Sequence, residues 1–240
     1  RLGIMKVYCT KFNSSMHDSV AILMGTYNGA KYIRPQLDSI GAQMFENWRL
    51  VASDDGSTDE TIEILQEYQS RWGGDRLEIR QGPSRGFSNN FMTMACDPTI
   101  HSDLYAFADQ DDVWLPEKLQ VAVDYHRQYS GNETPRVYCG RTAYVKDDLK
   151  PYANSPLFVY PRTFRNALVQ SIAGGNTMVF NKAAKRLIES ANVFSPVSHD
   201  WWLYQLITGA GGVVYYDKDP LVLYRQHDES LVGGNRSLIE

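Results

Sequence analysis

The chain has 240 residues, of which 43% are hydrophobic, and this is enough apolar material for the core of one large domain. Its formal net charge of −4 gives no support for nucleic acid as a partner. Cys9, Cys96 and Cys139 stand far apart and form no metal motif, so we expect reduced thiols in a cytoplasmic protein. No apolar run approaches the roughly 20 residues of a membrane-spanning helix, and we expect no signal peptide.

Short apolar runs and segments with helical spacing alternate through the first half of the chain. We expect strands at 20–24, 48–53, 77–80 and 104–108. The expected helices cover 30–43, 62–72, 87–96 and 116–129. This alternation predicts an α/β fold with a mostly parallel central sheet flanked by helices. Ser57 and Glu60 have the spacing of a capping box, which predicts the start of the second helix.

The pattern changes after about residue 135. We expect one strand over 137–145, followed by a loop over 146–162 that contains prolines. The remaining expected elements are a helix at 167–172, a strand at 177–180, helices at 183–191 and 199–207, and strands at 212–216 and 221–224.

Two of the expected strands end in clusters of carboxylates. Asp54 and Asp55 follow the second strand, and Asp109, Asp111 and Asp112 follow the fourth. Ligands of open α/β sheets bind beyond the carboxyl ends of the strands, and carboxylates this close repel unless a cation lies among them. Mg²⁺ or Mn²⁺ suits such oxygen ligands and shares its coordination with phosphates. An acidic turn that caps a helix is the alternative for either cluster alone, but two clusters at one sheet edge favour a site.

Three motifs, in this order and spacing, resemble family 2 glycosyltransferases of the GT-A fold. They are Thr26-Tyr27-Asn28-Gly29, Asp54-Asp55-Gly56-Ser57-Thr58-Asp59 and Asp109-Gln110-Asp111-Asp112-Val113-Trp114. Within the family, the chain is most similar to bacterial rhamnosyltransferase-type enzymes, over roughly residues 19–233.

The resemblance implies a metal-dependent enzyme that transfers a sugar with inversion of configuration. The implied donor is dTDP-rhamnose, or alternatively a UDP-hexose, and the implied cofactor is Mg²⁺ or Mn²⁺. The implied acceptor is a hydroxyl of a cell-surface polysaccharide or of its lipid-linked precursor, reached in the cytoplasm or at the inner face of the membrane. The resemblance divides the chain into an arm or added sequence at 1–18, a nucleotide-sugar half at 19–135, an acceptor half of the same domain at 136–235, and a tail at 236–240.

The resemblance also assigns donor-binding residues. They are Thr26, Tyr27, Asn28, Asp54, Asp55, Arg85, Asp109 and Gln110. Tyr27 beside Gly29 could stack on a base, although the same residues suit an ordinary strand-to-helix turn. One of Asp54 and Asp55 contacts the base or ribose, and the sequence leaves open which. Arg85 suits anionic oxygens, but an arginine before a helix is more often solvated.

On the acceptor side, Gly175 allows close backbone approach to a ligand, and the resemblance puts it and Asn176 beside the sugar. Asp200 precedes two tryptophans at an expected helix start. It is either the N-cap of that helix or, by the resemblance, the general base. Trp201 and Trp202 offer flat faces to a sugar, and core packing is their alternative.

The C-terminal motif contributes the last two assignments. By the resemblance, Arg225 approaches the diphosphate, and His227 joins Asp109 and Asp111 at the metal. Two other functions remain open, a nucleotidyltransferase and a non-catalytic protein that binds sugar nucleotides. The first would favour a glycine-rich, basic loop after the first strand, which residues 26–30 lack. The second is disfavoured by acids at all three sites.

Overall fold

The computed structural model describes residues 18–129, 133–159, 161–191 and 196–226. The expected arm, except for its last residue, the expected tail and His227 lie outside the described residues. Within the described part of the chain, no helix combines the length and the apolar character needed to cross a membrane.

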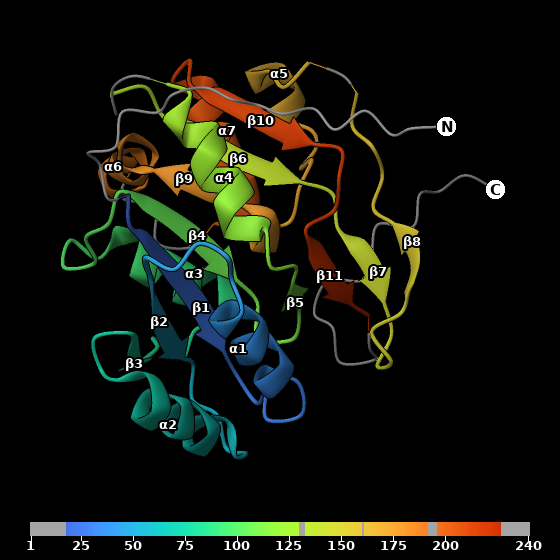
Figure 1. Ribbon diagram of the computed structural model, residues 1–240. Coiled ribbons are helices and arrows are strands. Elements are labelled where there is room, and N and C mark those ends of the chain that lie inside the picture. The colour runs from blue at the N-terminus through green and yellow to red at the C-terminus, as the bar shows by residue number, and fades with distance from the viewer. Residues whose placement is uncertain (1–17, 130–132, 160, 192–195, 227–240) are drawn as a thin grey trace.

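Within these ranges, seven strands form the central sheet in the order β10-β6-β9-β4-β1-β2-β3 (Figure 1). They are β1 (Val20–Thr26), β2 (Trp48–Asp54), β3 (Leu77–Gln81), β4 (Leu104–Ala108), β6 (Arg136–Gly140), β9 (Val179–Asn181) and β10 (Val213–Asp217). Neighbouring strands are parallel, except that β9 runs antiparallel to both β4 and β6. The predicted α/β fold with a mostly parallel sheet is confirmed.

The register of β1 aligns the ends of three strands. Thr26 is paired with Asp54 of β2, and Met24 is paired with Ala108 of β4. The segments that follow these strands therefore leave the sheet at one edge, which is where ligands of α/β sheets bind.

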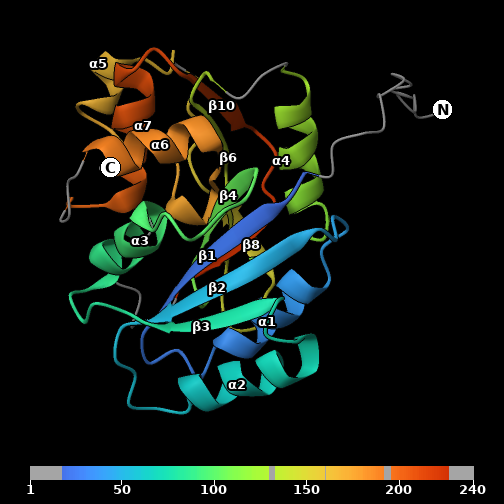
Figure 2. The same ribbon diagram turned by 90° about the vertical axis from the view of Figure 1, so that its left-hand side faces the viewer.

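Helices cover both faces of the sheet (Figure 2). One face carries α1 (Ile33–Gly41), α2 (Thr61–Trp72) and α4 (Lys118–Arg127). The other carries α3 (Phe87–Cys96), α6 (Lys182–Ala191), α7 (His199–Gly209) and the short α5 (Phe164–Ala167). Successive side chains of β1 alternate between the two layers, with Ile22 and Met24 on one side and Ala21 and Leu23 on the other. Burial on both faces explains why β1 is a continuous apolar run.

A smaller sheet adjoins the central one, with the order β5-β11-β7-β8 within the described residues. Its strands are β5 (Val113–Trp114), β7 (Ala143–Val145), β8 (Pro151–Asn154) and β11 (Val222–Arg225). Residues 109–112 are all that separates β4 from β5. The acidic loop therefore connects the two sheets.

The expected single strand at 137–145 is wrong, because the chain changes sheets at Gly140. The N–H of Arg141 donates to the carbonyl oxygen of Asp217 at 3.2 Å, and an added Cβ on Gly140 would meet the same oxygen at 3.3 Å. This close approach ends β6, and β7 then pairs with β11 in the smaller sheet. The expected loop at 146–162 contains β8, which is exposed along its length and so lacks an apolar pattern.

One expected helix and one expected capping motif are also wrong. The helix expected at 167–172 lies earlier, at 164–167, where the side chain of Thr163 accepts the N–H of Asn166. The capping box does not form, since α2 begins at Thr61 and the hydroxyl of Ser57 donates to Asp54 at 2.5 Å. By contrast, α3 and β4 have the predicted bounds. Part of the strand expected at 177–180 is a 3₁₀ turn at Gly175–Thr177.

Candidate active site

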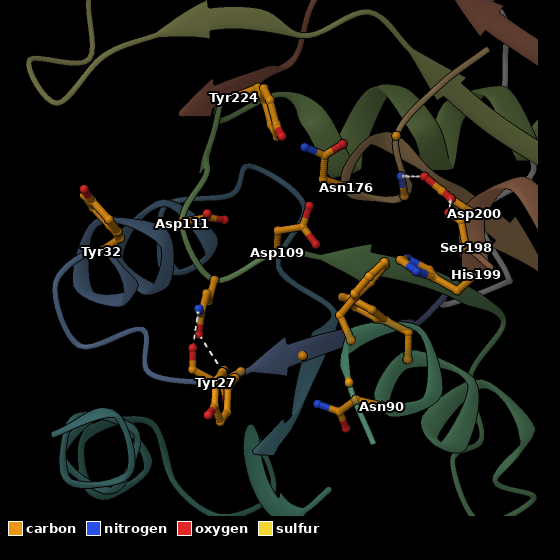
Figure 3. Close-up of a pocket in the computed structure, with 18 of the residues that line it drawn as sticks. Tyr27, Tyr32, Asn90, Asp109, Asp111, Asn176, Ser198, His199, Asp200 and Tyr224 are labelled. Atoms are coloured by element: carbon orange, nitrogen blue, oxygen red, sulfur yellow. Dashed lines mark hydrogen bonds between the residues drawn. The ribbon is translucent and has the colours of Figure 1, made fainter. Parts of the chain in front are cut away.

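A cavity of about 1620 Å³ opens where the central sheet meets the smaller one (Figure 3). Its wall includes Tyr27 after β1, Asp109 and Asp111 after β4, Asp200 in the first turn of α7, and Tyr224 of β11. Segments that are far apart in the sequence therefore meet at this cavity.

The cavity brings most of the predicted site residues together. Its lining includes Thr26, Tyr27, Asn28, Asp55, Asp109, Gln110, Asp111, Gly175, Asn176, Asp200 and Trp201. The described structure puts five others away from its wall, namely Asp54, Arg85, Asp112, Trp202 and Arg225. His227 lies outside the described residues. The binding or catalytic role of each residue stays a prediction.

Asp54 and Asp55 have different surroundings, although they are neighbours. Asp54 accepts hydrogen bonds from the hydroxyl of Thr26 at 2.9 Å and from the N–H and hydroxyl of Ser57 at 2.8 and 2.5 Å. Asp55 accepts the N–H groups of Ser84 and Gly86, each at 2.7 Å, and lines the cavity. Asp54 therefore shapes the loop, while Asp55 is the one that a ligand in the cavity can reach.

The loop after β1 is tied to the acidic loop by one side chain. The amide group of Gln110 accepts the N–H of Tyr27 and donates to its carbonyl oxygen, both at 2.9 Å. An added Cβ on Gly29 would overlap this amide, so a larger residue there would displace the Gln110 side chain. The side chain of Tyr27 is 56% exposed and borders the cavity, where its ring can cover a flat ligand.

Negative charge accumulates at the acidic loop. Burial, together with the charges of Asp111 and Asp200, raises the pKa of Asp109 to about 8. Burial and the charges of Asp111 and Asp109 likewise hold the pKa of Asp112 well above its usual range. Such repulsion among carboxylates is what a bound cation relieves, so the residues present fit a divalent metal.

Asp112 has different surroundings from the other two acids of the loop. This side chain is fully buried and accepts hydrogen bonds from the amide of Asn176 and from the N–H of Arg225. Among the described residues, no group of three or more His, Cys, Asp or Glu side chains is arranged to hold a metal. Asp109 and Asp111 remain, and Mg²⁺ is commonly held by one or two carboxylates with substrate phosphates completing its shell.

Arg225 is buried behind the acidic loop. Its Nε donates to the carbonyl oxygen of Asp111 at 3.0 Å, and its guanidinium lies 4.9 Å from the ring centroid of Tyr32. In this arrangement the guanidinium supports the backbone of the loop. Arg85 is exposed in the turn before α3.

Asp200 is not the N-cap of α7, because that position belongs to Ser198. One carboxylate oxygen of Asp200 accepts the N–H of Gly175 at 2.9 Å. The other accepts the N–H of Trp201 at 2.7 Å and the hydroxyl of Ser198. An acid in the first turn is favoured by the helix dipole. These donors fix the carboxylate on the cavity wall, with lone pairs still available to a ligand.

The two tryptophans after Asp200 differ. Trp201 borders the cavity, and its indole N–H donates to the carbonyl oxygen of Ala167 at 2.6 Å. Both tryptophans pack against the core layer that contains α3 and α6. Core packing is the only one of the two expected roles that the position of Trp202 fits, because Trp202 does not line the cavity.

Some cavity residues were missed by the sequence analysis. Tyr224 stands beside the predicted Arg225, and His199 directly precedes Asp200. Alternation along β11 could have indicated Tyr224, because neighbouring strand residues face opposite sides. Phe87 and Phe91, at the start of α3, also contribute to the wall, and apolar side chains there are indistinguishable from core residues in a sequence.

Residues 21–188 match the sequence model of Glycosyl transferase family 2. The chain belongs to this family. It is 28% identical over 235 residues to the dTDP-rhamnosyl transferase RfbG of Shigella flexneri, covering 89% of this chain and 75% of that protein. It is 31% identical over 105 residues to the Escherichia coli glucosyltransferase WfgD, covering 43% and 39% of the two chains. The protein is therefore a glycosyltransferase.

Solved structures agree on the fold. The S. aureus TarS structure in complex with UDP-GlcNAc superposes with a TM-score of 0.65 at 17% identity, covering 88% of this chain. The mannosyltransferase PcManGT of Pyrobaculum calidifontis, in complex with GDP-Man and Mn²⁺, also gives 0.65, at 18% identity over 90% of this chain. The chain spans 60% of the TarS chain and 59% of the PcManGT chain. The fold is GT-A.

Proposed function

We propose that this glycosyltransferase moves a sugar from a nucleoside diphosphate to a hydroxyl, with inversion at the anomeric carbon. The observation that carries the proposal is that Asp200 shares one cavity with Asp109 and Asp111, close enough for its charge to act on Asp109. A sugar held between them would have a base on one side and its leaving group on the other. A single in-line displacement needs this arrangement.

In this mechanism Asp200 accepts the proton of the acceptor hydroxyl. The hydroxyl oxygen forms a bond to the anomeric carbon as the bond from that carbon to the diphosphate oxygen breaks, and the electron pair leaves with the nucleoside diphosphate. One displacement inverts the configuration and needs no covalent intermediate. The hydrogen bonds from Gly175 and Trp201 support this role, because they hold the carboxylate before the substrate arrives.

Asp109 and Asp111 would hold Mg²⁺ or Mn²⁺ together with the diphosphate. When bound, the cation would offset the charge that develops on the leaving group. The repulsion that raises the pKa of Asp109 supports this site, and the Mn²⁺ in the PcManGT complex is in keeping with it.

The nucleoside would bind between Tyr27 and Asp55. The exposed Tyr27 ring offers a stacking surface, and Asp55 offers carboxylate oxygens to a base or ribose hydroxyl. The paired hydrogen bonds of Gln110 link this part of the cavity to the acidic loop. The nucleoside and the diphosphate would therefore lie along one continuous wall of the cavity.

For the donor we propose dTDP-rhamnose, supported by the similarity to RfbG, with a UDP-hexose as the alternative. The acceptor would be a polysaccharide hydroxyl or its lipid-linked precursor. The chain borders the cavity at Phe158 and again at Ser171. The segment between these two residues, which belongs to the expected acceptor half of the chain, therefore adjoins the cavity.

That segment has the features of a membrane-contact surface, and we propose that it touches an anionic bilayer. Val159, Leu168 and Val169 are exposed apolar residues, with Val169 at 77%. Arg162 and Arg165 lie among them, and residues 149–188 contain no Asp or Glu although the whole chain carries a net charge of −4. Apolar side chains beside basic ones favour anionic lipid surfaces.

A donor panel tests the proposed function without knowledge of the acceptor. The protein would be incubated with Mg²⁺ and dTDP-rhamnose, UDP-glucose or UDP-galactose, and the nucleotide products separated by chromatography. We expect nucleoside diphosphate release from dTDP-rhamnose, through slow transfer to water. Pyrophosphate release would indicate a nucleotidyltransferase, and binding without turnover of any donor would indicate a non-catalytic protein. Turnover of a UDP-hexose alone would refute rhamnosyl transfer only.

A further inference from the structure

The imidazole of His199 lies at the wall of the cavity and is 5% exposed. Within the described residues, neither of its ring nitrogens has a hydrogen-bond partner. Its neighbours are aromatic: the ring stacks on Phe91 at 4.1 Å and meets the edge of Phe107 at 4.7 Å. Figure 3 shows the imidazole of His199 next to Asp200.

This environment would suit a phenylalanine better than a histidine if packing were the only requirement. Buried polar atoms that lack partners destabilise a folded protein, because they lose their hydrogen bonds to water. Burial lowers the pKa of His199, so the ring is neutral and presents one N–H donor and one acceptor nitrogen. A hydroxyl group, which both donates and accepts, is a matching partner.

The position of the ring indicates which hydroxyl. Gly175 donates its N–H to Asp200, and an added Cβ on the same glycine would overlap Nε2 of His199. One turn thus holds the carboxylate of Asp200 and contacts the imidazole. In the proposed mechanism, the transferred sugar lies between Asp200 and Asp109, and His199 borders that space.

We propose that His199 hydrogen-bonds a hydroxyl of the transferred sugar and is a specificity-determining residue for the donor. The inference rests on the proposed function, because it takes the sugar position from it. Both nitrogens are shielded from solvent in the ligand-free protein. Phe87, which is 37% exposed and lies 6.1 Å from the imidazole, is the neighbour with room to move as the sugar enters. Phe91 and Phe107 are held in the core.

The decisive variant is His199→Phe, which keeps an aromatic ring and removes both nitrogens. Calorimetry would measure the affinity for the nucleoside diphosphate and for the nucleotide sugar, and their ratio gives the contribution of the sugar. We expect an equal or higher melting temperature and unchanged nucleoside diphosphate affinity. The sugar contribution and kcat/KM for donor turnover should fall roughly 5- to 10-fold, as for one lost hydrogen bond between neutral groups. A donor that lacks the contacted hydroxyl should lose affinity for the wild type but not for this variant.

His199→Gln provides the opposite comparison, because it restores a donor and an acceptor but fills the aromatic site poorly. We expect it to be less stable than His199→Phe and yet to bind the sugar better. Phe107→Leu is the matched packing control: it removes a ring beside His199, lies away from the cavity wall, and should lower stability while leaving the sugar contribution intact.

A sugar contribution unchanged in His199→Phe would overturn the inference, as would weaker sugar binding in His199→Gln than in His199→Phe. If the wild type binds no nucleotide sugar, the proposed function fails first, and this outcome is distinct from the other two.

Discussion

The side-chain amide of Asn176 donates a hydrogen bond to the buried carboxylate of Asp112. This contact joins two parts of the site that are 64 residues apart in the chain. Asp112 ends the acidic loop that carries Asp109 and Asp111, and Asn176 follows the glycine that holds Asp200. The distance between the proposed base and the proposed metal-binding acids is therefore fixed by a contact inside the protein.

We expect Asn176→Ala to lower both stability and turnover. It leaves the carboxylate of Asp112 with one donor fewer in a buried site, which costs about 1–3 kcal/mol. Urea unfolding and donor turnover would measure the two effects. Gln69→Ala is the control, because the Gln69 amide donates to the carbonyl oxygen of Leu77 at 2.8 Å and neither residue lines the cavity. Equal turnover in the two variants would mean that the contact does not position the site.

The raised pKa of Asp109 predicts a stability that falls with rising pH in the metal-free protein. Its pKa is about 8 in the folded chain and about 3.9 when unfolded, so between these values the folded state binds more protons. The free energy of unfolding contributed by this group therefore decreases from about pH 4 to about pH 8 and is constant above that. Urea unfolding of the wild type and Asp109→Asn in EDTA measures it. The free energy of unfolding of Asp109→Asn should exceed that of the wild type by an amount that grows up to about pH 8. If the difference between the two proteins did not change with pH, the raised pKa of Asp109 would be contradicted.

Divalent metal should govern affinity for the nucleoside diphosphate. We expect EDTA, or Asp111→Asn with Mg²⁺ present, to weaken binding at least about tenfold, since the cation links carboxylates to phosphates. Calorimetry would measure both, with the exposed Asp75→Asn as the charge-matched control. Affinity that survives both treatments would exclude a metal role for Asp111.

Binding to vesicles tests the surface around α5. Wild-type protein should co-sediment with vesicles that contain phosphatidylglycerol and not with pure phosphatidylcholine. Arg162→Gln with Arg165→Gln should weaken this binding roughly 20-fold or more, from about 1 kcal/mol for each basic residue near an anionic surface. Leu168→Ser with Val169→Ser should also weaken it, whereas Met44→Ser, at a 62% exposed site outside this segment, should not. Absence of wild-type binding would refute the membrane contact.

The sequence predicted the elements whose burial is continuous. β4 is buried at every position and ends in the acidic loop, so both the strand and the acids after it could be recognised. β8 could not, because its residues are exposed. The strand expected at 177–180 overlaps β9, but its antiparallel pairing with β4 and β6, which are distant in the chain, could not be predicted. Such pairing depends on tertiary contacts that no local pattern records.

In the candidate site, too, some features could be predicted from the sequence and others depend on tertiary contacts. The acid clusters could be found from their places after strands, but Asp54 and Asp55 have identical chemistry and differ only in which backbone N–H groups they meet. Asp112 looked equivalent to Asp111 until its partners were known. The importance of His199 depends on the absence of partners within the described residues, which only a three-dimensional structure can reveal.

The most direct test of the proposed mechanism is donor turnover by Asp200→Asn. Both oxygens of Asp200 accept hydrogen bonds, so the amide must turn its NH₂ toward one donor, and stability should fall by about 1 kcal/mol. Nucleoside diphosphate affinity should be unchanged, which would show that the donor site is intact. Donor turnover should fall roughly 10²- to 10⁴-fold, the usual contribution of a positioned general base. A turnover rate within a few-fold of wild type would contradict the assignment of Asp200 as the base.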